Sequence, residues 1–265
     1  MGQSFAREGP RSFTLGTKSV GENMQVWKKL VIIAAVLFTA ECAPGWLVAQ
    51  QSPQPAFSAD AQAERIPNLD SLKKELRQYH DCACACGCYA RDLDTQADRA
   101  IAFLRQRAAH RRAQENLALI LDIDETTLSN YQELAGADFA YNAPVFNAWV
   151  ESAQAPAIPG TLRLFKEAER LGVNVLFITG RSETQRDATE RNLRAQGFDH
   201  WQELMMRRAD QESETASTYK QAARGQLVAK GYTLALSVGD QWSDLKGKPE
   251  AEYSVKYPDP YYFIP

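Results

Sequence analysis

The chain has 265 residues, of which 45% are hydrophobic and 24% charged, the composition of an ordinary globular protein. This length suffices for one sizeable hydrophobic core or at most two small ones, and the composition excludes a fibrous or intrinsically disordered protein. Residues 1–49 hold five of the 30 basic and three of the 33 acidic residues, so the remainder has a net charge of −5. That charge argues against a nucleic-acid-binding surface.

Residues 24–49 have the layout of a secretory signal peptide. Two lysines precede an apolar run of 11 residues, LVIIAAVLFTA, and small residues and a polar segment follow it. A membrane-spanning anchor is the alternative, but it needs about 18 or more apolar residues, so we expect cleavage and no stable membrane anchor. Met24 is then the natural start, 1–23 is an upstream extension and 50–65 is a linker. The mature protein is expected to be secreted or periplasmic.

Two helices are predicted at the start of the remaining domain, 66–265. Apolar residues recur at helical spacing over 69–79 and again over 89–104. Between them lies HDCACACGCYA, a patch with four cysteines: Cys82, Cys84, Cys86 and Cys88. In an oxidising compartment we expect disulfides or structural thiols there; a metal site is the alternative, although ordinary zinc sites use C-x₂-C spacing. The patch is expected to be structural and separate from catalysis.

Four short apolar runs follow, at 117–123, 173–180, 203–207 and 233–240. They lack the polar alternation of a half-exposed strand, and amphipathic helical stretches separate them. This order is typical of a parallel sheet with helices on both faces. The predicted fold class is therefore α/β with a mainly parallel central sheet.

Polar side chains gather where three of these predicted strands end, which is where ligands bind in such sheets. The candidates, in chain order, are Asp122, Asp124, Thr179, Gly180, Asp240 and Asp244. Clustered carboxylates repel one another in a partly desolvated site unless a cation compensates, and all-oxygen ligation suits Mg²⁺. The pattern therefore predicts a magnesium-dependent site for phosphoryl transfer.

The spacing of these residues suggests separate roles. Asp122 and Asp124 lie two apart on a strand, so both can face one bound group, where one attacks phosphorus and the other protonates the leaving oxygen. Thr179 supplies a hydroxyl, with backbone N–H groups, at the start of a helix that SETQ (182–185) opens as a capping box. Lys220, on an amphipathic stretch before the fourth strand, could neutralise charge on a transferring phosphoryl group.

These motifs, in this order, resemble those of the haloacid dehalogenase (HAD) superfamily of phosphotransferases. DIDETTLSN is similar to its first motif, FITGR to its second, Lys220 to its third and GDQWSD to its fourth. NAWVESAQAPAIPGTLRLFKEAERLGV and VKYPDPYYFIP resemble the class B-like branch, which contains bacterial and plant acid phosphatases and vegetative storage proteins. The resemblance covers roughly residues 66–265. The cysteine patch departs from it, because this branch usually has a Ser-Gly type segment there.

The resemblance implies a Rossmann-like three-layer sandwich with a small cap insertion and N-terminal helices. It also implies Mg²⁺-dependent acid phosphatase activity on small-molecule phosphate monoesters through an aspartyl-phosphate. Asp122 would be the nucleophile, and Asp124 the general acid and later the base for water. The phosphate-binding residues would be Thr179, Gly180 and Lys220.

By the same resemblance, the metal ligands would be the Asp122 side chain, the Asp124 backbone carbonyl and Asp240, with Asp244 just outside them. Two other functions stay open: a non-catalytic storage or binding protein on the same fold, and a 5′-nucleotidase of the same superfamily. The carboxylate at Asp122 favours an enzyme. The sequence leaves the oligomeric state open.

Several other residues have two interpretations at this stage. Arg181 either contacts substrate or forms a salt bridge to a nearby carboxylate. Tyr141, Phe146 and Trp149 lie where the superfamily inserts its cap, so they form either an apolar wall for substrate or core packing. Arg224 is expected to be structural, and none of the three histidines is assigned a catalytic role.

Overall fold

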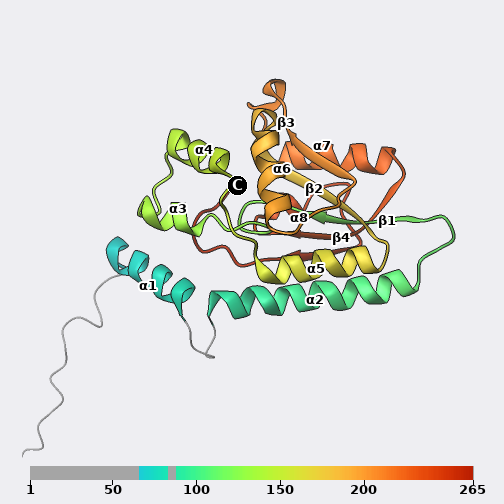
Figure 1. The fold of residues 1–265 in the computed structure, drawn as a ribbon, viewed down its shortest axis with the longest axis horizontal. Helices are drawn as coiled ribbons and strands as arrows, with labels where there is room; N and C mark the ends of the chain where they lie inside the picture. Colours follow the sequence, from blue (N-terminus) through green and yellow to red (C-terminus); the bar gives the residue numbers. More distant parts are fainter. Residues whose placement is uncertain (1–65, 83–87, 265) are drawn as a thin grey trace, which may run out of the picture. The chain divides into compact units, whose positions relative to one another are not determined.

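The computed structural model describes residues 66–82 and 88–264, all within the compact unit Asp60–Pro265. The expected signal peptide, the 50–65 linker, Cys84 and Cys86 lie outside the described residues. The described part is built around a five-stranded sheet in the order β3-β2-β1-β4-β5, with every pairing parallel (Figure 1). The expected α/β class with a parallel sheet is therefore confirmed.

The central strand of this sheet, β1, is apolar on both faces. The strands are β1 (Asn116–Leu121), β2 (Asn174–Ser182), β3 (Glu203–Arg207), β4 (Tyr232–Gly239) and β5 (Tyr253–Lys256). All of β1 except its first residue is buried. Leu117, Leu119 and Leu121 pack into one hydrophobic cluster, and Ala118 and Ile120 into another on the opposite face. A central strand covered on both faces needs no polar alternation.

Helices cover both faces of the sheet, which makes three layers (Figure 1). α2 (Tyr89–Ala109) and α5 (Pro159–Arg170) contribute to the cluster on the Leu119 side, and α7 (Ala216–Ala229) to the cluster on the Ile120 side. Close approach of α2 and α5 depends on Gly160, because a Cβ there would lie 2.7 Å from the Ala97 Cβ. The chain also forms α6 (Arg186–Ala195), α8 (Trp242–Leu245), and the 3₁₀ helices η2 (Glu183–Gln185) and η3 (Ala209–Gln211).

Two short helices between β1 and α5 form the cap insertion that the family resemblance implied: α3 (Tyr131–Gly136) and α4 (Ala143–Ser152). The Asn142 side chain caps α4 by accepting from Val145 N. α1 (Leu69–Asp81) is held beside α3 because Lys73 and Arg77 both form salt bridges to Asp138. Every residue of α1 keeps at least partial exposure, so its predicted apolar stripe is only half buried.

The fifth strand, β5, was not predicted. It has four residues at the edge of the sheet, and among them only Val255 is buried. So short a segment carries no periodic apolar signal of its own, and its pairing with β4 alone makes it a strand. In the described part of the chain, no helix combines the length and the apolar character that crossing a membrane requires.

Candidate active site

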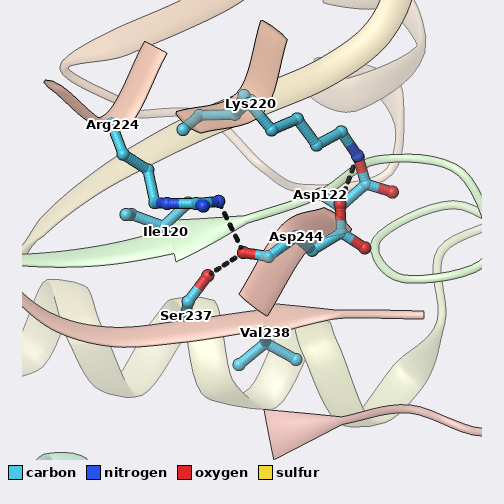
Figure 2. Close-up of a pocket in the computed structure, with 8 residues that line it drawn as sticks. Ile120, Asp122, Lys220, Arg224, Ser237, Val238 and Asp244 are labelled. Atoms are coloured by element: carbon cyan, nitrogen blue, oxygen red, sulfur yellow. Dashed lines mark hydrogen bonds and ion pairs between the residues drawn. The ribbon is translucent and has the colours of Figure 1, made fainter. Parts of the chain in front are cut away.

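The nucleophile candidate, Asp122, follows β1 directly, and its backbone N–H donates to Val238 O of β4 at 3.1 Å. Its carboxylate is buried and accepts from Lys220 Nζ at 2.7 Å (Figure 2). Burial raises the pKa of Asp122 to about 7; Lys220 acts against this shift, and the carboxylates of Asp244 and Asp124 add to it. The surroundings therefore disfavour a negative charge on Asp122 unless more positive charge is supplied.

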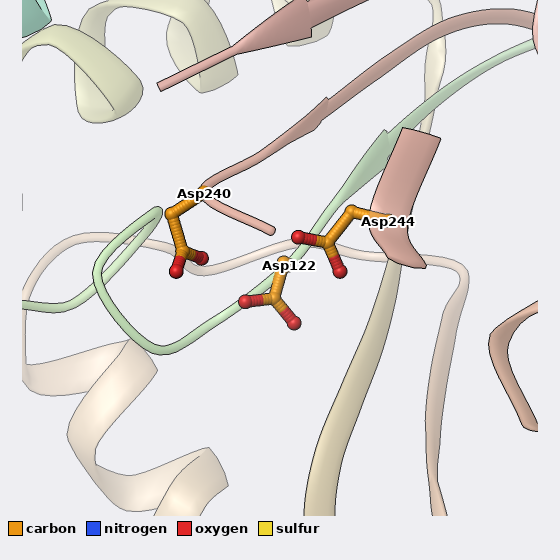
Figure 3. A group of neighbouring side chains, drawn as sticks. All are labelled: Asp122, Asp240 and Asp244. Atoms are coloured by element: carbon orange, nitrogen blue, oxygen red, sulfur yellow. The ribbon is translucent and has the colours of Figure 1, made fainter. Parts of the chain in front are cut away.

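Three buried carboxylates, Asp122, Asp240 and Asp244, come together as an acidic trio (Figure 3). One carboxylate oxygen of each lies within 4.8 Å of one oxygen of each of the others. Asp240 follows β4 and accepts from Thr126 Oγ1 at 2.9 Å and from Gln241 Nε2 at 2.7 Å. Burial, followed by repulsion from the other two members, raises the pKa of Asp240 well above its usual range.

Asp244 reaches the trio because α8 begins immediately after β4. Its backbone carbonyl accepts from Ser237 Oγ at 3.0 Å and from Arg224 Nη1 at 3.1 Å (Figure 2). Gly239 is required at the turn, since a Cβ there would lie 2.3 Å from the Asp244 side chain. Arg224 also donates to four other backbone carbonyls, so it has the structural role expected of it.

Lys220 enters the site from α7, one helical turn before Arg224, and is itself buried. Its ammonium group donates to Asp122 and also to Asp244. Burial opposes its positive charge, but the carboxylates of Asp122 and Asp244 outweigh burial and raise the pKa of Lys220. It therefore stays protonated and offsets part of the charge on the acidic trio.

Asp124 is held by a different set of partners from Asp122. Arg181 Nη2 donates to Asp124 Oδ1 at 2.7 Å, and Asn130 Nδ2 donates to the same oxygen at 2.8 Å. Burial alone would raise the pKa of Asp124, but Arg181, helped by Asn130, outweighs burial and lowers it. Of the two interpretations of Arg181, the structure shows the salt bridge, formed by a side chain that is 2% exposed.

Thr179 and Gly180 lie where β2 bulges away from β3. The pairing register shifts between Ile178 and Ser182, and such bulges often redirect residues beside active sites. Thr179 is fully buried, and its Oγ1 accepts from Arg181 N at 3.2 Å, whereas Gly180 is exposed. The predicted capping box is present: Ser182 N donates to Gln185 Oε1 at 3.2 Å, and η2 begins there.

The three cap aromatics have separate surroundings. Tyr141 is 74% exposed, and its ring centroid lies 5.9 Å from that of half-buried Phe146. Trp149 is half-buried, and its Nε1 donates to the buried Asn130 Oδ1 at 2.8 Å. Trp149 therefore packs against the hydrophobic core, whereas Tyr141 stays at the surface, and the three residues form no continuous wall.

Sequence reasoning missed a group of buried polar residues beside Asp124. Glu125 Oε1 accepts from the Asn130 backbone N–H at 2.6 Å, and Glu125 Oε2 accepts from Tyr262 OH at 3.1 Å. Burial, followed by the charge of Asp124, raises the pKa of Glu125 to about 8. Glu125 and Asn130 lie inside DIDETTLSN and were a possible signal. Tyr262 and Trp149 are distant in sequence, and nothing in their spacing indicated that they reach this group.

Among the cysteines, the described pair lies at the junction of α1 and α2. The Sγ atoms of Cys82 and Cys88 are 2.7 Å apart. His80, in the last turn of α1, stacks on Tyr131 of α3 with 3.3 Å between the ring centroids. These contacts connect α1 to α2 and to the cap.

The acidic trio fits a hard divalent cation. Its donors are all carboxylate oxygens, the atoms that Mg²⁺ prefers. All three side chains are buried, and the pKa values of Asp122 and Asp240 are raised, as expected where negative charge exceeds the positive charge that Lys220 supplies. A bound dication would remove this repulsion.

Comparison with known families gives one match that spans most of the chain. Residues 47–265 match the family described as HAD superfamily, subfamily IIIB (Acid phosphatase). The search of solved structures finds the class C acid phosphatase from Bacillus anthracis, with a TM-score of 0.62 and 21% identity, covering 74% of this chain and 86% of that one. At this identity the likeness supports the fold alone.

Curated relatives come from plants. "Acid phosphatase 1" from Solanum lycopersicum is 41% identical over 150 residues, which are 55% of this chain and 58% of that protein. "Stem 28 kDa glycoprotein" from Glycine max is 32% identical over 181 residues, covering 66% of this chain and 70% of that protein. "Vegetative storage protein 1" from Arabidopsis thaliana is 33% identical over 55% of each chain. The chain thus spans less than two thirds of the tomato protein.

Proposed function

Because the chain belongs to subfamily IIIB of the HAD superfamily, the acid phosphatases, we propose that it hydrolyses small-molecule phosphate monoesters through an aspartyl-phosphate. The observation that most supports this proposal is the position of Asp122: a buried carboxylate at the end of β1, beside Lys220 and two further carboxylates. Asp122 offers the carboxylate, and Lys220 the positive charge, that a phosphoryl-transfer site needs, and a bound dication would favour the charged form of Asp122.

The reaction has two steps. An Asp122 carboxylate oxygen attacks phosphorus, the bond from phosphorus to the ester oxygen breaks, and Asp124 gives that oxygen a proton, so the alcohol leaves. Asp124, now a carboxylate, takes a proton from water, and the water oxygen attacks phosphorus. The bond to Asp122 then breaks and inorganic phosphate is released. The two carboxylates have different partners, Lys220 for Asp122 and Arg181 for Asp124, and the acid role requires that Asp124 take up a proton against the influence of Arg181.

We assign Mg²⁺ to the acidic trio. Asp122 and Asp240 would bind it through their side chains and Asp124 through its backbone carbonyl, with Asp244 just outside these ligands. When bound, Mg²⁺ supplies positive charge that neutralises the carboxylates and the phosphoryl oxygens.

Thr179, Gly180 and Lys220 are assigned to the phosphate. Gly180 is exposed where β2 bulges, so its backbone is accessible to a phosphate oxygen. Thr179 would offer its hydroxyl, whose oxygen already accepts from Arg181 N. Lys220 would balance the charge that spreads over the phosphoryl oxygens during transfer.

Two other functions were weighed. A storage or binding protein on the same fold would not need the nucleophile, yet Asp122, Asp124 and Lys220 are all present and paired with partners. A 5′-nucleotidase would use the same chemistry with a more selective surface around the site. We therefore retain the acid phosphatase as the proposal.

The proposed location is secreted or periplasmic. It rests on the signal-peptide pattern of residues 24–49, with 1–23 as an upstream extension, 50–65 as a linker and 66–265 as the catalytic domain.

The test is a panel of phosphate monoesters that includes aryl phosphates, alkyl phosphates and 5′-nucleotides, assayed by phosphate release with Mg²⁺ and after chelation. We expect release from several esters that stops when the divalent cation is removed. The absence of release from every ester at acid and neutral pH would refute the enzyme assignment. Strong selectivity for 5′-nucleotides would favour the nucleotidase.

A further inference from the structure

Asn130 lies at the centre of a buried hydrogen-bond chain that runs from the cap to Asp124. Its amide nitrogen donates to Asp124 Oδ1 at 2.8 Å and to Glu125 Oε2 at 3.0 Å. Its amide oxygen accepts from Trp149 Nε1 of α4 at 2.8 Å. Asn130 is fully buried, and all three partners are side chains.

The partners determine which way the Asn130 amide points. An indole N–H can only donate, so the amide oxygen must face Trp149. Both amide hydrogens then face the carboxylates of Asp124 and Glu125. The indole and the two carboxylates favour the same orientation, because a 180° rotation of the amide would place its oxygen against two carboxylate oxygens and its N–H groups against the indole N–H.

The position of Asn130 in the chain supports a role beyond local structure. It precedes α3 as the N-cap residue, a position where asparagine usually accepts from backbone N–H groups of the first turn. Within the described residues, its side chain makes no such capping bond. The amide that would stabilise the helix end is instead directed at Asp124.

Asp124 is held on a second side by Arg181, whose Nε and Nη2 both donate to it. Arg181 is positioned in turn by Thr189 Oγ1, at 3.2 Å from Nη1. Rotation of the Asp124 carboxylate is therefore restricted by two groups, one from the second motif and one from the first. Among the residues that the structure describes, the hydrogen bonds of Asn130 lead on to Trp149 of the cap, and those of Arg181 lead to Thr189 of α6.

We propose that Asn130 is a positioning residue for the acid-base carboxylate Asp124, and that Trp149 of the cap helix α4 orients it. This inference rests on the proposed function. Its consequence is that the cap governs how well Asp124 protonates the leaving group. Loss of these hydrogen bonds should therefore slow the hydrolysis of esters with poor leaving groups most, since the leaving groups of activated aryl esters need little protonation.

The test uses two variants of the full-length protein and two controls. Asn130→Leu removes the amide and keeps a similar volume; Trp149→Phe keeps a ring and removes only the N–H donor. Asn192→Leu is the control for the first, because the Asn192 side chain is equally buried and bonds only the Ala155 backbone. Trp201→Phe is the control for the second, since its ring packs on Phe177.

The measurement is kcat/KM for an aryl phosphate and for an alkyl phosphate, because kcat/KM covers the step in which the alcohol leaves. We expect the ratio of aryl to alkyl values to rise by about tenfold or more in Asn130→Leu, and by a smaller factor in Trp149→Phe, within the range of general acid catalysis. Both controls should stay within about twofold of the parent ratio, because neither touches Asp124.

Equal losses on both esters in Trp149→Phe and Asn130→Leu, or the same ratio change in the controls, would overturn the inference while leaving the phosphatase intact. A parent protein inactive on both esters would overturn the proposed function and this inference with it. If Asn130→Leu does not fold, as checked by thermal unfolding, Trp149→Phe decides the outcome alone.

Discussion

At the scale of single residues, the two aspartates of the first motif differ in their neighbours more than in their positions. Asp122 is bonded to Lys220, and its pKa is raised to about 7, chiefly by burial. Asp124 is bonded to Arg181 and Asn130, and these partners lower its pKa despite burial. Two carboxylates two residues apart thus have surroundings that shift their pKa values in opposite directions. These shifts run against the proposed roles, because a nucleophile must be charged and an acid must carry a proton; a dication bound beside Asp122 would favour its charged form.

Asp122→Asn should reduce phosphate release to background, because the amide keeps the shape but lacks the attacking charge. We expect circular dichroism and thermal unfolding close to those of the parent. Asp138→Asn is the matched control: it removes an exposed carboxylate that bonds Lys73 and Arg77, so turnover should be retained. Phosphate release by purified Asp122→Asn at the parent rate would contradict the aspartyl-phosphate mechanism.

Asp124→Asn tests the acid role separately. The variant should lose about 10²- to 10⁴-fold on alkyl phosphates, the usual contribution of general acid catalysis, and clearly less on activated aryl phosphates. Steady-state rates on one ester of each kind give the comparison. Equal losses on both would mean that Asp124 serves the metal and not the leaving group.

At the scale of elements, the short connection from β4 to α8 and the spacing within α7 position side chains of the candidate site. α8 starts three residues after β4, which brings Asp244 back against Gly239, and α7 carries Lys220 and Arg224 one turn apart on one face. Away from the site, α5 is tied to α2 by Glu167, which accepts from Arg105 Nε at 2.6 Å and from Arg170 of its own helix.

Glu167→Gln should lower stability in a pH-dependent way. Hydrogen bonds from Arg170, followed by those from Arg105, lower the pKa of Glu167 from 4.5 to about 2. A lowered pKa stabilises the fold above the unfolded value of 4.5, and this stabilisation is lost as the pH falls towards 2.

Both arginines are more than half exposed, so we expect a loss of about 1 kcal/mol or less at pH 7. Denaturant unfolding between pH 7 and pH 3 measures the difference between parent and variant, which should shrink below about pH 4.5. A difference that stays constant over this range would indicate lost packing instead of lost charge.

At the scale of the described domain, the acidic trio joins elements from distant parts of the chain. Asp122 follows β1, Asp240 follows β4, and Asp244 lies in α8. A cation bound by Asp122 and Asp240, with Asp244 beside them, would connect β1 and β4 in the folded state and find no such site in the unfolded chain. Metal binding should therefore raise the free energy of unfolding.

Addition of Mg²⁺ should raise the melting temperature. At a free Mg²⁺ concentration of 100 times the dissociation constant, the stabilisation is about 2.7 kcal/mol. For a domain of this size this corresponds to a rise in melting temperature of roughly 5–11 °C. Differential scanning calorimetry with Mg²⁺, and again after chelation, measures the shift. Asp240→Asn should abolish most of it, whereas Asp138→Asn should not; a shift retained in Asp240→Asn would locate the ion elsewhere.

The amino-acid sequence by itself determined the local features of this protein. Four apolar runs without alternation predicted four parallel strands, and the SETQ pattern predicted the capping box at Ser182, because both depend on neighbouring residues. The order of the motifs indicated the HAD superfamily, which the family match confirms. The roles of the individual site residues stay predictions that the variants above test.

Only the tertiary structure decided which distant side chains meet. Glu125 and Tyr262 are 137 residues apart, and β5 became a strand only through its pairing with β4. The choice between two roles for Arg181 depended on its salt bridge to Asp124, a residue 57 positions earlier in the chain. Spacing along the chain records which residues share a strand or a helix face, whereas the direction of a buried hydrogen bond depends on packing between elements. The connection from Trp149 through Asn130 to Asp124 was for that reason invisible in the sequence.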